Sequence, residues 1–341
     1  MSGEIRARPA PRCRLCGREG EALYEGLRDR LFSAPGLWSH RRCPGEDCGL
    51  VWLDPIPLAE DLHLAYASYY THAPRPPSAS LVARAFAAAK RGYVANRYGY
   101  TASALQRLLG LLPWLYPGRP SELDFSVMWL HAGGRGRLLD VGAGSGWLVE
   151  HMASLGWQAE GLDFDAEAVR LPRKRGLAMH QGALEEQRFA AASFDAVTMS
   201  HSIEHVPDPP AQLAEARRIL RPGGRLAIAT PNARSLGHRR FGAHWFALDP
   251  PRHLHLFNRA ALSAALATAG FARSRVFTST RDANGAWLGS RAIRDTGRHD
   301  MLASPSAAWK LLGRGAQLGE LLALPGDPDA GEDLVAIAEA P

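Results

Sequence analysis

The chain has 341 residues, enough for one large domain or two smaller ones with a complete hydrophobic core. With 46% hydrophobic and 22% charged residues the composition is that of a globular protein, which excludes a fibrous or disordered chain. The formal charge of +6 comes from scattered arginines, so we expect no nucleic-acid-binding stripe and only a general preference for a phosphate-bearing substrate.

No segment has the length and apolarity of a transmembrane helix, and residues 1–12 lack the apolar stretch of a secretory signal. The most apolar segment, 108–116, is short and contains Pro113. Four cysteines without a signal are typical of a reducing compartment, so we expect a cytoplasmic protein without disulfides.

The cysteines form two close pairs, each followed by a glycine, Gly17 or Gly49, where the chain can turn sharply. Two such knuckles can direct four thiolates at one tetrahedral Zn²⁺. The predicted ligands of this structural site are Cys13, Cys16, Cys43 and Cys48. His40 could replace one of them, and the alternative is four free thiols.

Helical patterns dominate the next part of the chain. Leu58, Leu62 and Tyr66 have helical spacing, and the Pro- and Ser-rich residues 73–80 are predicted to form a linker. Residues 81–112 predict a long helix, and Pro113 to Pro120 interrupts the pattern before another predicted helix over 121–130.

The long predicted helix carries an aromatic and basic face. Its members are Arg91, Tyr93, Arg97, Tyr98 and Tyr100. Such a face can stack on bases or sugars, but we expect this one to pack under the neighbouring domain.

Residues 138–165 predict a strand, a tight turn, a helix and a second strand. The turn has glycine at every second position: Gly142, Gly144 and Gly146. A dinucleotide site would need glycine where this chain has Trp147. Asp163 closes the second strand, where a carboxylate can bind a ribose diol.

Alternating elements continue to residue 230. A helix is predicted around 166–174, a strand over 177–180, and a buried strand over 193–200 that runs into His201–Asp208. A helix carrying Leu213, Ala216 and Leu220 follows, and a further strand covers 225–230.

Three segments in this order, the glycine turn, Ser200–Asp208 and Leu220–Asn232, resemble motifs of class I S-adenosylmethionine-dependent methyltransferases. The second resembles the ubiquinone-biosynthesis-like branch, and the cysteine-rich N-terminus resembles the zinc-ribbon-like module of a subset of these enzymes. The resemblance implies an α/β Rossmann-like fold whose seven-stranded, mostly parallel sheet has an antiparallel last strand.

The predicted organisation has three parts. Residues 1–57 form the zinc-ribbon-like module, 58–130 a helical connector or cap, and 131–341 the methyltransferase domain. Within the last part, 231–257 and 281–330 are insertions on the substrate side. We expect the second insertion to contain one helix, around Trp309 to Leu322, and to be a candidate lid.

The C-terminal region also shows conventional helix and strand signals. Asn258 is predicted to cap a helix that Gly270 ends. Residues 271–280 should form the sixth strand and 334–338 the antiparallel last one.

The resemblance implies S-adenosylmethionine as the cofactor. Its implied contacts are Asp140, Gly142, Ala143, Gly144, Gly146, Asp163, Phe164, Gly182, Ala183, Leu184 and Ser200. The family usually has Gly-Asp where this chain has Gly182-Ala183, so a side-chain contact to the adenine amino group is not expected here.

The methyl group of a sulfonium is already activated, so the protein has to align the acceptor and remove a hydroxyl proton. His201, at the end of the fourth strand, is the first choice of base, followed by His205 and His253. Each of these histidines has the alternative of a purely structural role.

Some relatives hold a divalent cation near this position. His201, Glu204 and His205 have the spacing of one face of a helical turn. That branch has a carboxylate where this chain has His201, and Mg²⁺ prefers oxygen ligands, so we expect Glu204 and His205 to fix the loop instead.

The favoured function is O-methylation of a small hydroxylated metabolite, a sugar nucleotide or a glycan precursor. An RNA-base methyltransferase is an alternative, although no Asn-Pro-Pro-Tyr or Asp-Pro-Pro-Tyr follows the fourth strand. A cofactor-binding regulator without turnover is a second alternative.

Overall fold

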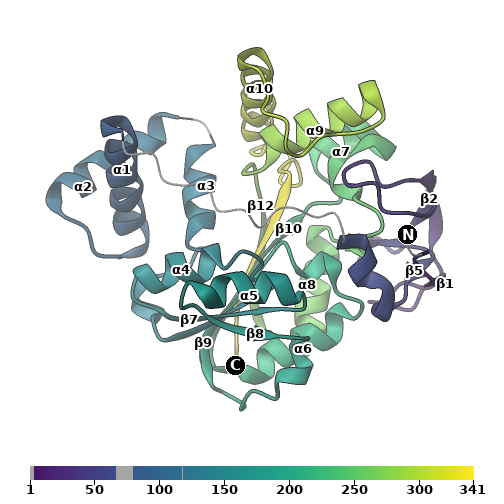
Figure 1. Ribbon diagram of the computed structural model, residues 1–341, viewed down its shortest axis with the longest axis horizontal. Coiled ribbons are helices and arrows are strands. Elements are labelled where there is room, and N and C mark those ends of the chain that lie inside the picture. The colour runs from purple at the N-terminus through teal and green to yellow at the C-terminus, as the bar shows by residue number, and fades with distance from the viewer. Residues whose placement is uncertain (1–3, 67–79, 117) are drawn as a thin grey trace.

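The computed structural model describes residues 4–66, 80–116 and 118–341, arranged around a seven-stranded sheet (Figure 1). In spatial order its strands are β12 (Arg273–Ser279), β13 (Asp333–Glu339), β10 (Leu220–Pro231), β9 (Phe194–Ser200), β6 (Arg137–Val141), β7 (Gln158–Asp163) and β8 (Ala178–Gln181). β13 is antiparallel to β10 and β12, whereas β10, β9, β6, β7 and β8 pair in parallel. This arrangement confirms the predicted fold.

Helices cover both faces of the sheet because its central strands are apolar on both sides. Leu138 belongs to a core with α3 (Arg119–Ser126) and α4 (Trp147–Ser154). Its neighbour Leu139 faces the opposite core, with α6 (Pro209–Ile219) and α8 (Arg259–Thr268). The helix α5 (Ala166–Lys174) packs beside α4 through Val169 and Val149.

A second sheet joins the N-terminal part to the substrate-side insertion. Its strands are β2 (Glu21–Leu27), β3 (Trp38–Arg42), β4 (Val51–Leu53) and β11 (His255–Leu256). In β11 the register pairs His255 with Trp52. β1 (Ala7–Arg8) and β5 (Ile56–Pro57) form a separate pair. The N-terminal module therefore shares backbone hydrogen bonds with the catalytic part, and the boundary at residue 57 stays a prediction.

One helical expectation in the first third of the chain is wrong, and another is confirmed as a 3₁₀ helix. The run 81–112 is two helices, α1 (Leu81–Tyr98) and α2 (Ala104–Leu109), because Gly99 adopts φ 77° and ends the first. Residues 59–66 form the 3₁₀ helix η1 (Ala59–Tyr66), and η2 (Leu112–Leu115) and η3 (Ala132–Gly134) are also 3₁₀. The predicted linker falls largely on residues 73–79, which lie outside the described residues.

The aromatic face of the 81–112 region packs inside the protein, as expected. Tyr93, Tyr98 and Tyr100 are buried in the core that includes α3 and α4. Tyr100 accepts a hydrogen bond from the Trp157 indole at 2.9 Å, which ties this region to the central domain.

The two predicted insertions follow the strands β10 and β12. The first contains α7 (Leu236–Phe241), η6 (Gly242–His244) and η7 (Phe246–Leu248). The second contains two helices, α9 (Ala283–Thr296) and α10 (Ala307–Ala323), which correct the single helix expected there. No helix in the described parts of the chain is long and apolar enough to cross a membrane.

Candidate active site

The glycine turn lies between β6 and α4, at the carboxyl edge of the sheet. All three glycines are left-handed, with φ values of 79°, 50° and 70° for Gly142, Gly144 and Gly146. A Cβ on Gly142 would lie 2.4 Å from Cβ of Ser202, so a larger residue would collide with the segment that follows β9. The turn and the end of β9 are therefore in direct contact.

Asp163, at the end of β7, holds the turn in place. Its Oδ2 accepts the Gly144 N–H at 2.8 Å and its Oδ1 accepts the Asp165 N–H at 2.9 Å. The neighbouring Phe164 is 49% exposed, and its ring lies edge-on to that of Tyr66.

Asp140 lies below the turn and is buried in the sheet. It accepts a hydrogen bond of 2.8 Å from the Thr198 hydroxyl on β9. Burial, helped by the charge of Asp163, raises the pKa of Asp140 to about 7. A cationic ligand group nearby would favour its ionised form.

The predicted adenine turn follows β8. Gly182 is left-handed at φ 117° and donates to the Asp163 carbonyl at 3.0 Å. The Ala183 N–H is taken by the Glu186 carboxylate at 2.9 Å, and Leu184 is buried. The 3₁₀ helix η4 (Glu185–Gln187) follows, and Ser200, partly exposed, ends β9 nearby.

His201 lies just beyond β9 in a left-handed conformation, with φ 49°. Its Nε2 is 2.7 Å from Nη1 of Arg281. Arginine can only donate, so Nε2 is the acceptor and the proton of the neutral ring sits on Nδ1. Nδ1 in turn approaches Oε1 of Glu204 at 3.5 Å, so the imidazole lies between a carboxylate and the Arg281 guanidinium.

The electrostatic surroundings of His201 favour its charged form. Burial opposes the charge, but the Asp333 and Glu204 carboxylates outweigh it and raise the pKa of His201. Asp333, at the start of β13, lies 3.8 Å from Nε2, and burial raises its own pKa to about 6. The Arg281 guanidinium lies 3.5 Å from the centre of the Phe125 ring, so this aromatic side chain covers the site.

Glu204 is fully buried in η5 (Ile203–His205). Its Oε2 accepts the Thr230 hydroxyl at 2.9 Å, and Oε1 has no hydrogen bond within the described residues. Burial disfavours its charge, but His201 and His205 outweigh burial and lower the pKa to about 2. An ionised carboxylate is thus held beside His201.

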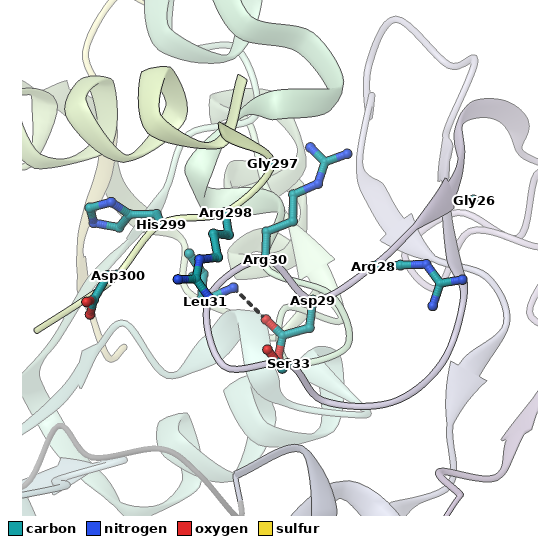
Figure 2. A pocket seen from close by; sticks show the side chains of 10 residues that line it. All are labelled: Gly26, Arg28, Asp29, Arg30, Leu31, Ser33, Gly297, Arg298, His299 and Asp300. Carbon is teal, nitrogen blue, oxygen red and sulfur yellow. Dashed lines mark hydrogen bonds between the residues drawn. The ribbon is translucent and has the colours of Figure 1, made fainter. Parts of the chain in front are cut away.

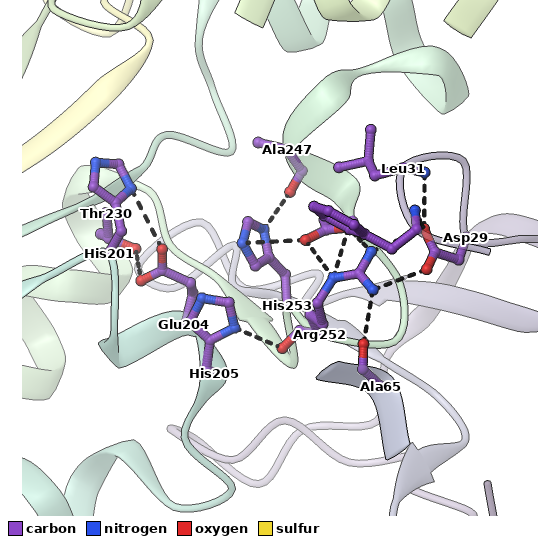
Figure 3. A network of polar contacts seen from close by, with 12 residues as sticks. Asp29, Leu31, Ala65, His201, Glu204, His205, Thr230, Ala247, Arg252 and His253 are labelled. Atoms are coloured by element: carbon purple, nitrogen blue, oxygen red, sulfur yellow. Dashed lines mark hydrogen bonds and ion pairs between the residues drawn. The ribbon is translucent and has the colours of Figure 1, made fainter. Parts of the chain in front are cut away.

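The imidazole rings of His205 and His253 pack against each other and not against His201 (Figure 3). The shared face expected for His201 and His205 is wrong, because His201 precedes the helical turn and contacts Arg281. His205 Nδ1 lies 3.0 Å from the Arg252 carbonyl and 2.9 Å from the Tyr66 hydroxyl. Burial, with the charge of His253, lowers the pKa of His205 to about 4, so the ring is neutral.

Glu204, His205 and His253 also form a possible donor set for a metal. One ligand atom from each lies within 4.8 Å of the others. The His253 Nδ1 donates to the Ala247 carbonyl at 2.7 Å, which orients the ring as in many metal sites. Two imidazoles and one carboxylate suit a transition ion such as Zn²⁺ better than Mg²⁺.

The four cysteines converge at the other end of the N-terminal module. Their sulfur atoms lie within 4.8 Å of one another, with 3.6 Å between Cys13 and Cys48 and 3.4 Å between Cys16 and Cys43. His40 is not part of this group. Gly17 and Gly49 are left-handed, as two knuckles require.

A family model described as a methyltransferase domain matches residues 76–273, more than half of the chain. The chain belongs to the class I S-adenosylmethionine-dependent methyltransferases. The glycine turn, Asp163 and the 182–184 turn, where the sequence predicts the cofactor contacts, follow the parallel strands β6, β7 and β8 at one edge of the sheet. The contact with Ser202 leaves no room for a side chain at Gly142.

The methyltransferase has relatives with named activities. It is 36% identical over 150 residues to the ubiquinone biosynthesis O-methyltransferase of Xanthomonas oryzae pv. oryzae, covering 41% of this chain and 62% of that protein. The enzyme of the same name from Paraburkholderia phymatum is 31% identical over 169 residues, covering 47% and 72%. A Thermotoga maritima SAM-dependent methyltransferase, titled a possible histamine N-methyltransferase, aligns with TM-score 0.45 and 19% identity over 74% of this chain and 99% of its own.

Several residues at the site of the methyltransferase were not expected from the sequence: Tyr66, Phe125, Thr230, Arg281 and Asp333. They come from five separate regions, so no local motif marks them. One signal existed, because an antiparallel strand begins at the edge where parallel strands end, and Asp333 is the first residue of β13.

Proposed function

We propose that this methyltransferase methylates a hydroxyl group of a small metabolite, with sugar nucleotides and glycan precursors as the preferred class. The observation that carries the proposal is the arrangement of His201 at the end of β9, with Glu204 3.5 Å from its Nδ1 and a donor on its Nε2, while the next residue, Ser202, packs against Gly142 of the glycine turn. The names of the relatives, O-methyltransferases, support the choice of an oxygen acceptor.

In the proposed mechanism, Nε2 of His201 takes the proton of the acceptor hydroxyl while Glu204 stabilises the imidazolium that forms. Arg281 now donates to that nitrogen, so the acceptor hydroxyl would replace it there. Bound S-adenosylmethionine supplies an activated methyl group. The Gly142–Gly146 backbone would hold its methionyl part, Asp163 its ribose, and Phe164 with the 182–184 turn its adenine.

The N-terminal module is proposed to hold a structural zinc ion. A tetrahedral site with Zn–S bonds of about 2.3 Å separates its sulfurs by ~3.8 Å. The sulfur–sulfur distances of 3.6 Å between Cys13 and Cys48 and 3.4 Å between Cys16 and Cys43 are close to that value. Four thiolates leave no open position, so the ion would stabilise the module rather than act on a substrate.

The first experiment is calorimetric titration with S-adenosylmethionine, S-adenosylhomocysteine and NAD⁺. We expect the first two to bind the wild type, binding to be lost in Asp163→Ala, and NAD⁺ not to bind. Methyl transfer to hydroxylated acceptors is then compared between wild type, His201→Gln and His63→Gln, an exposed histidine on η1.

The role of His201 predicts a specific result in that comparison. His201→Gln should bind S-adenosylhomocysteine like the wild type but turn over about 100-fold more slowly. His63→Gln should be unchanged. Equal turnover in all three proteins would exclude His201 as the base. If the wild type binds S-adenosylmethionine but transfers its methyl group to no acceptor, the result would favour a regulator without turnover.

A further inference from the structure

A separate cavity of about 400 Å³ lies between the N-terminal module and the second insertion (Figure 2). One wall is the loop after β2 and the other is the chain leaving α9. The lining residues are Gly26, Arg28, Asp29, Arg30, Leu31, Ser33, Gly297, Arg298, His299 and Asp300. Both walls lie outside residues 76–273, so the cavity belongs to the parts of this chain that the family model does not cover.

Hydrogen bonds fix the conformation of both walls. The Asp29 carboxylate accepts the backbone N–H groups of Leu31 at 2.8 Å and Ala34 at 2.7 Å, and it is also bound by Arg252. Gly297 is left-handed and caps α9, which turns the chain toward the cavity. The His299 N–H donates to the Arg30 carbonyl at 2.9 Å and joins the two walls.

The cavity has an excess of positive charge. Arg28, Arg30 and Arg298 line it, and none of the three forms an ion pair with a carboxylate among the described residues. Arg30 Nη1 donates to the Ala243 carbonyl at 2.9 Å, so Arg28 and Arg298 are the two guanidiniums without a protein acceptor among the described residues. The charge of Asp29 is offset by Arg252. Asp300 is exposed and accepts the Leu302 N–H, so the lining carries three guanidiniums against one carboxylate that has no cationic partner.

Guanidinium groups bind phosphate oxygens through paired, charge-assisted hydrogen bonds. The volume lies within the range of small-molecule sites. Hydrogen bonds link the cavity to the histidine pair next to Glu204, because Asp29 binds Arg252 and the Arg252 carbonyl contacts His205 (Figure 3).

We propose that this cavity, lined by Arg28, Arg30 and Arg298, binds the phosphate or diphosphate group of the acceptor substrate. The assignment to the acceptor rests on the proposed function. The binding of a phosphate anion does not, because it follows from the cavity and its charges alone. The alternative ligand with the same chemistry is a free phosphate anion that is not part of the acceptor.

The test uses inorganic pyrophosphate as the probe and the full-length protein. Calorimetry should detect pyrophosphate binding to the wild type, and the affinity should fall at least about 10-fold in the double variant Arg28→Ala/Arg298→Ala. Both arginines are exposed, so the fold should survive. Arg273→Ala, an exposed arginine on β12, is the matched control and should bind like the wild type.

S-adenosylhomocysteine binding, measured on the same samples, separates this site from the cofactor site and should be equal in all three proteins. If the wild type does not bind pyrophosphate, or the double variant binds it equally well, the anion site is wrong even where methyl transfer succeeds.

Kinetics with a nucleoside-diphosphate sugar decide the source of the anion. Competitive inhibition by pyrophosphate, with KM raised and kcat unchanged in the double variant, supports the acceptor. Non-competitive inhibition would overturn the assignment to the acceptor and leave the cavity to a free anion.

Discussion

Arg252 donates two hydrogen bonds of 2.8 Å to the carboxylate of Asp29, and neither side chain has any exposed surface. The two residues lie 223 positions apart in the chain. Asp249 also contacts the guanidinium. The pair joins the N-terminal module to the segment between β10 and β11, so each part depends on the other for its position.

Breaking this pair should be costly. Arg252→Leu leaves the Asp29 carboxylate buried without its partner, and we expect a loss of about 3–5 kcal/mol in the free energy of unfolding. Urea denaturation measures it. Arg218→Ala, which breaks an exposed pair with Glu215, should cost at most about 1 kcal/mol. Equal losses in the two variants would mean that the buried pair has no special role.

The pH dependence of methyl transfer should report the surroundings of His201. A general base must be neutral, and the pKa of His201 is raised, so kcat/KM should fall as the pH drops through a value above about 6.5. Asp333→Asn removes a carboxylate that raises this pKa and should move the acidic limb to lower pH. If the acidic limb of the kcat/KM profile lies at the same pH in Asp333→Asn as in the wild type, the assignment of His201 as the base is contradicted.

Zinc analysis tests the cysteine cluster. We expect about one zinc per chain in the wild type and a loss of most of it in Cys16→Ser, with the unfolding midpoint lowered by about 5–10 °C. Elemental analysis and calorimetry measure both effects. Glu46→Gln, an exposed change between the second pair of cysteines, should keep the metal. A zinc-free wild type that chelators do not destabilise would leave the cysteines as free thiols.

Two buried carboxyl groups, Glu320 on α10 and Glu332 before β13, should make the protein less stable at alkaline pH. Burial raises the pKa of Glu320 to about 8, and burial with the charge of Glu320 raises that of Glu332 well above its ordinary value. The folded state therefore binds more protons than the unfolded state between about pH 4.5 and 8. Stability falls as pH rises across this window, by at most about 1.4 kcal/mol per pH unit for each proton.

Glu332→Gln should reduce this fall, because the amide keeps an oxygen for the Trp245 indole and carries no charge. Urea denaturation between pH 6 and 9 measures the slope, with the exposed change Glu185→Gln as the control. A slope that Glu332→Gln leaves unaltered would show that protonation of Glu332 does not contribute to stability in this pH range.

The sequence predicts the central sheet well because each parallel strand is a short apolar run bounded by glycine or an acid. It does not predict α9, whose buried face has one large apolar residue, Ile293, and four small ones: Ala283, Ala286, Gly289 and Ser290. Helical periodicity is read from repeated large apolar side chains, and this helix buries a single one. The end of α1 could have been predicted from Gly99, because glycine in a left-handed conformation commonly ends a helix.

The candidate site divides in the same way. Gly142, Asp163 and His201 follow strands in recognisable motifs. Arg281 and Asp333, by contrast, reach His201 only because β12 and β13 end and begin at the same edge of the sheet. Such partners depend on the three-dimensional pairing of distant strands, which spacing along one chain does not report.

The pairing of β11 with β4 has a consequence for synthesis of the protein on the ribosome. Asn258, beside β11, binds the carbonyl of Gly49, 209 residues earlier in the chain. At about 5–20 residues per second the apolar edge of β4 waits ~10–40 s for its partner strand. During that time an open, hydrophobic strand edge is exposed to other nascent chains, so this protein should depend on chaperones during translation more than its compact final form indicates.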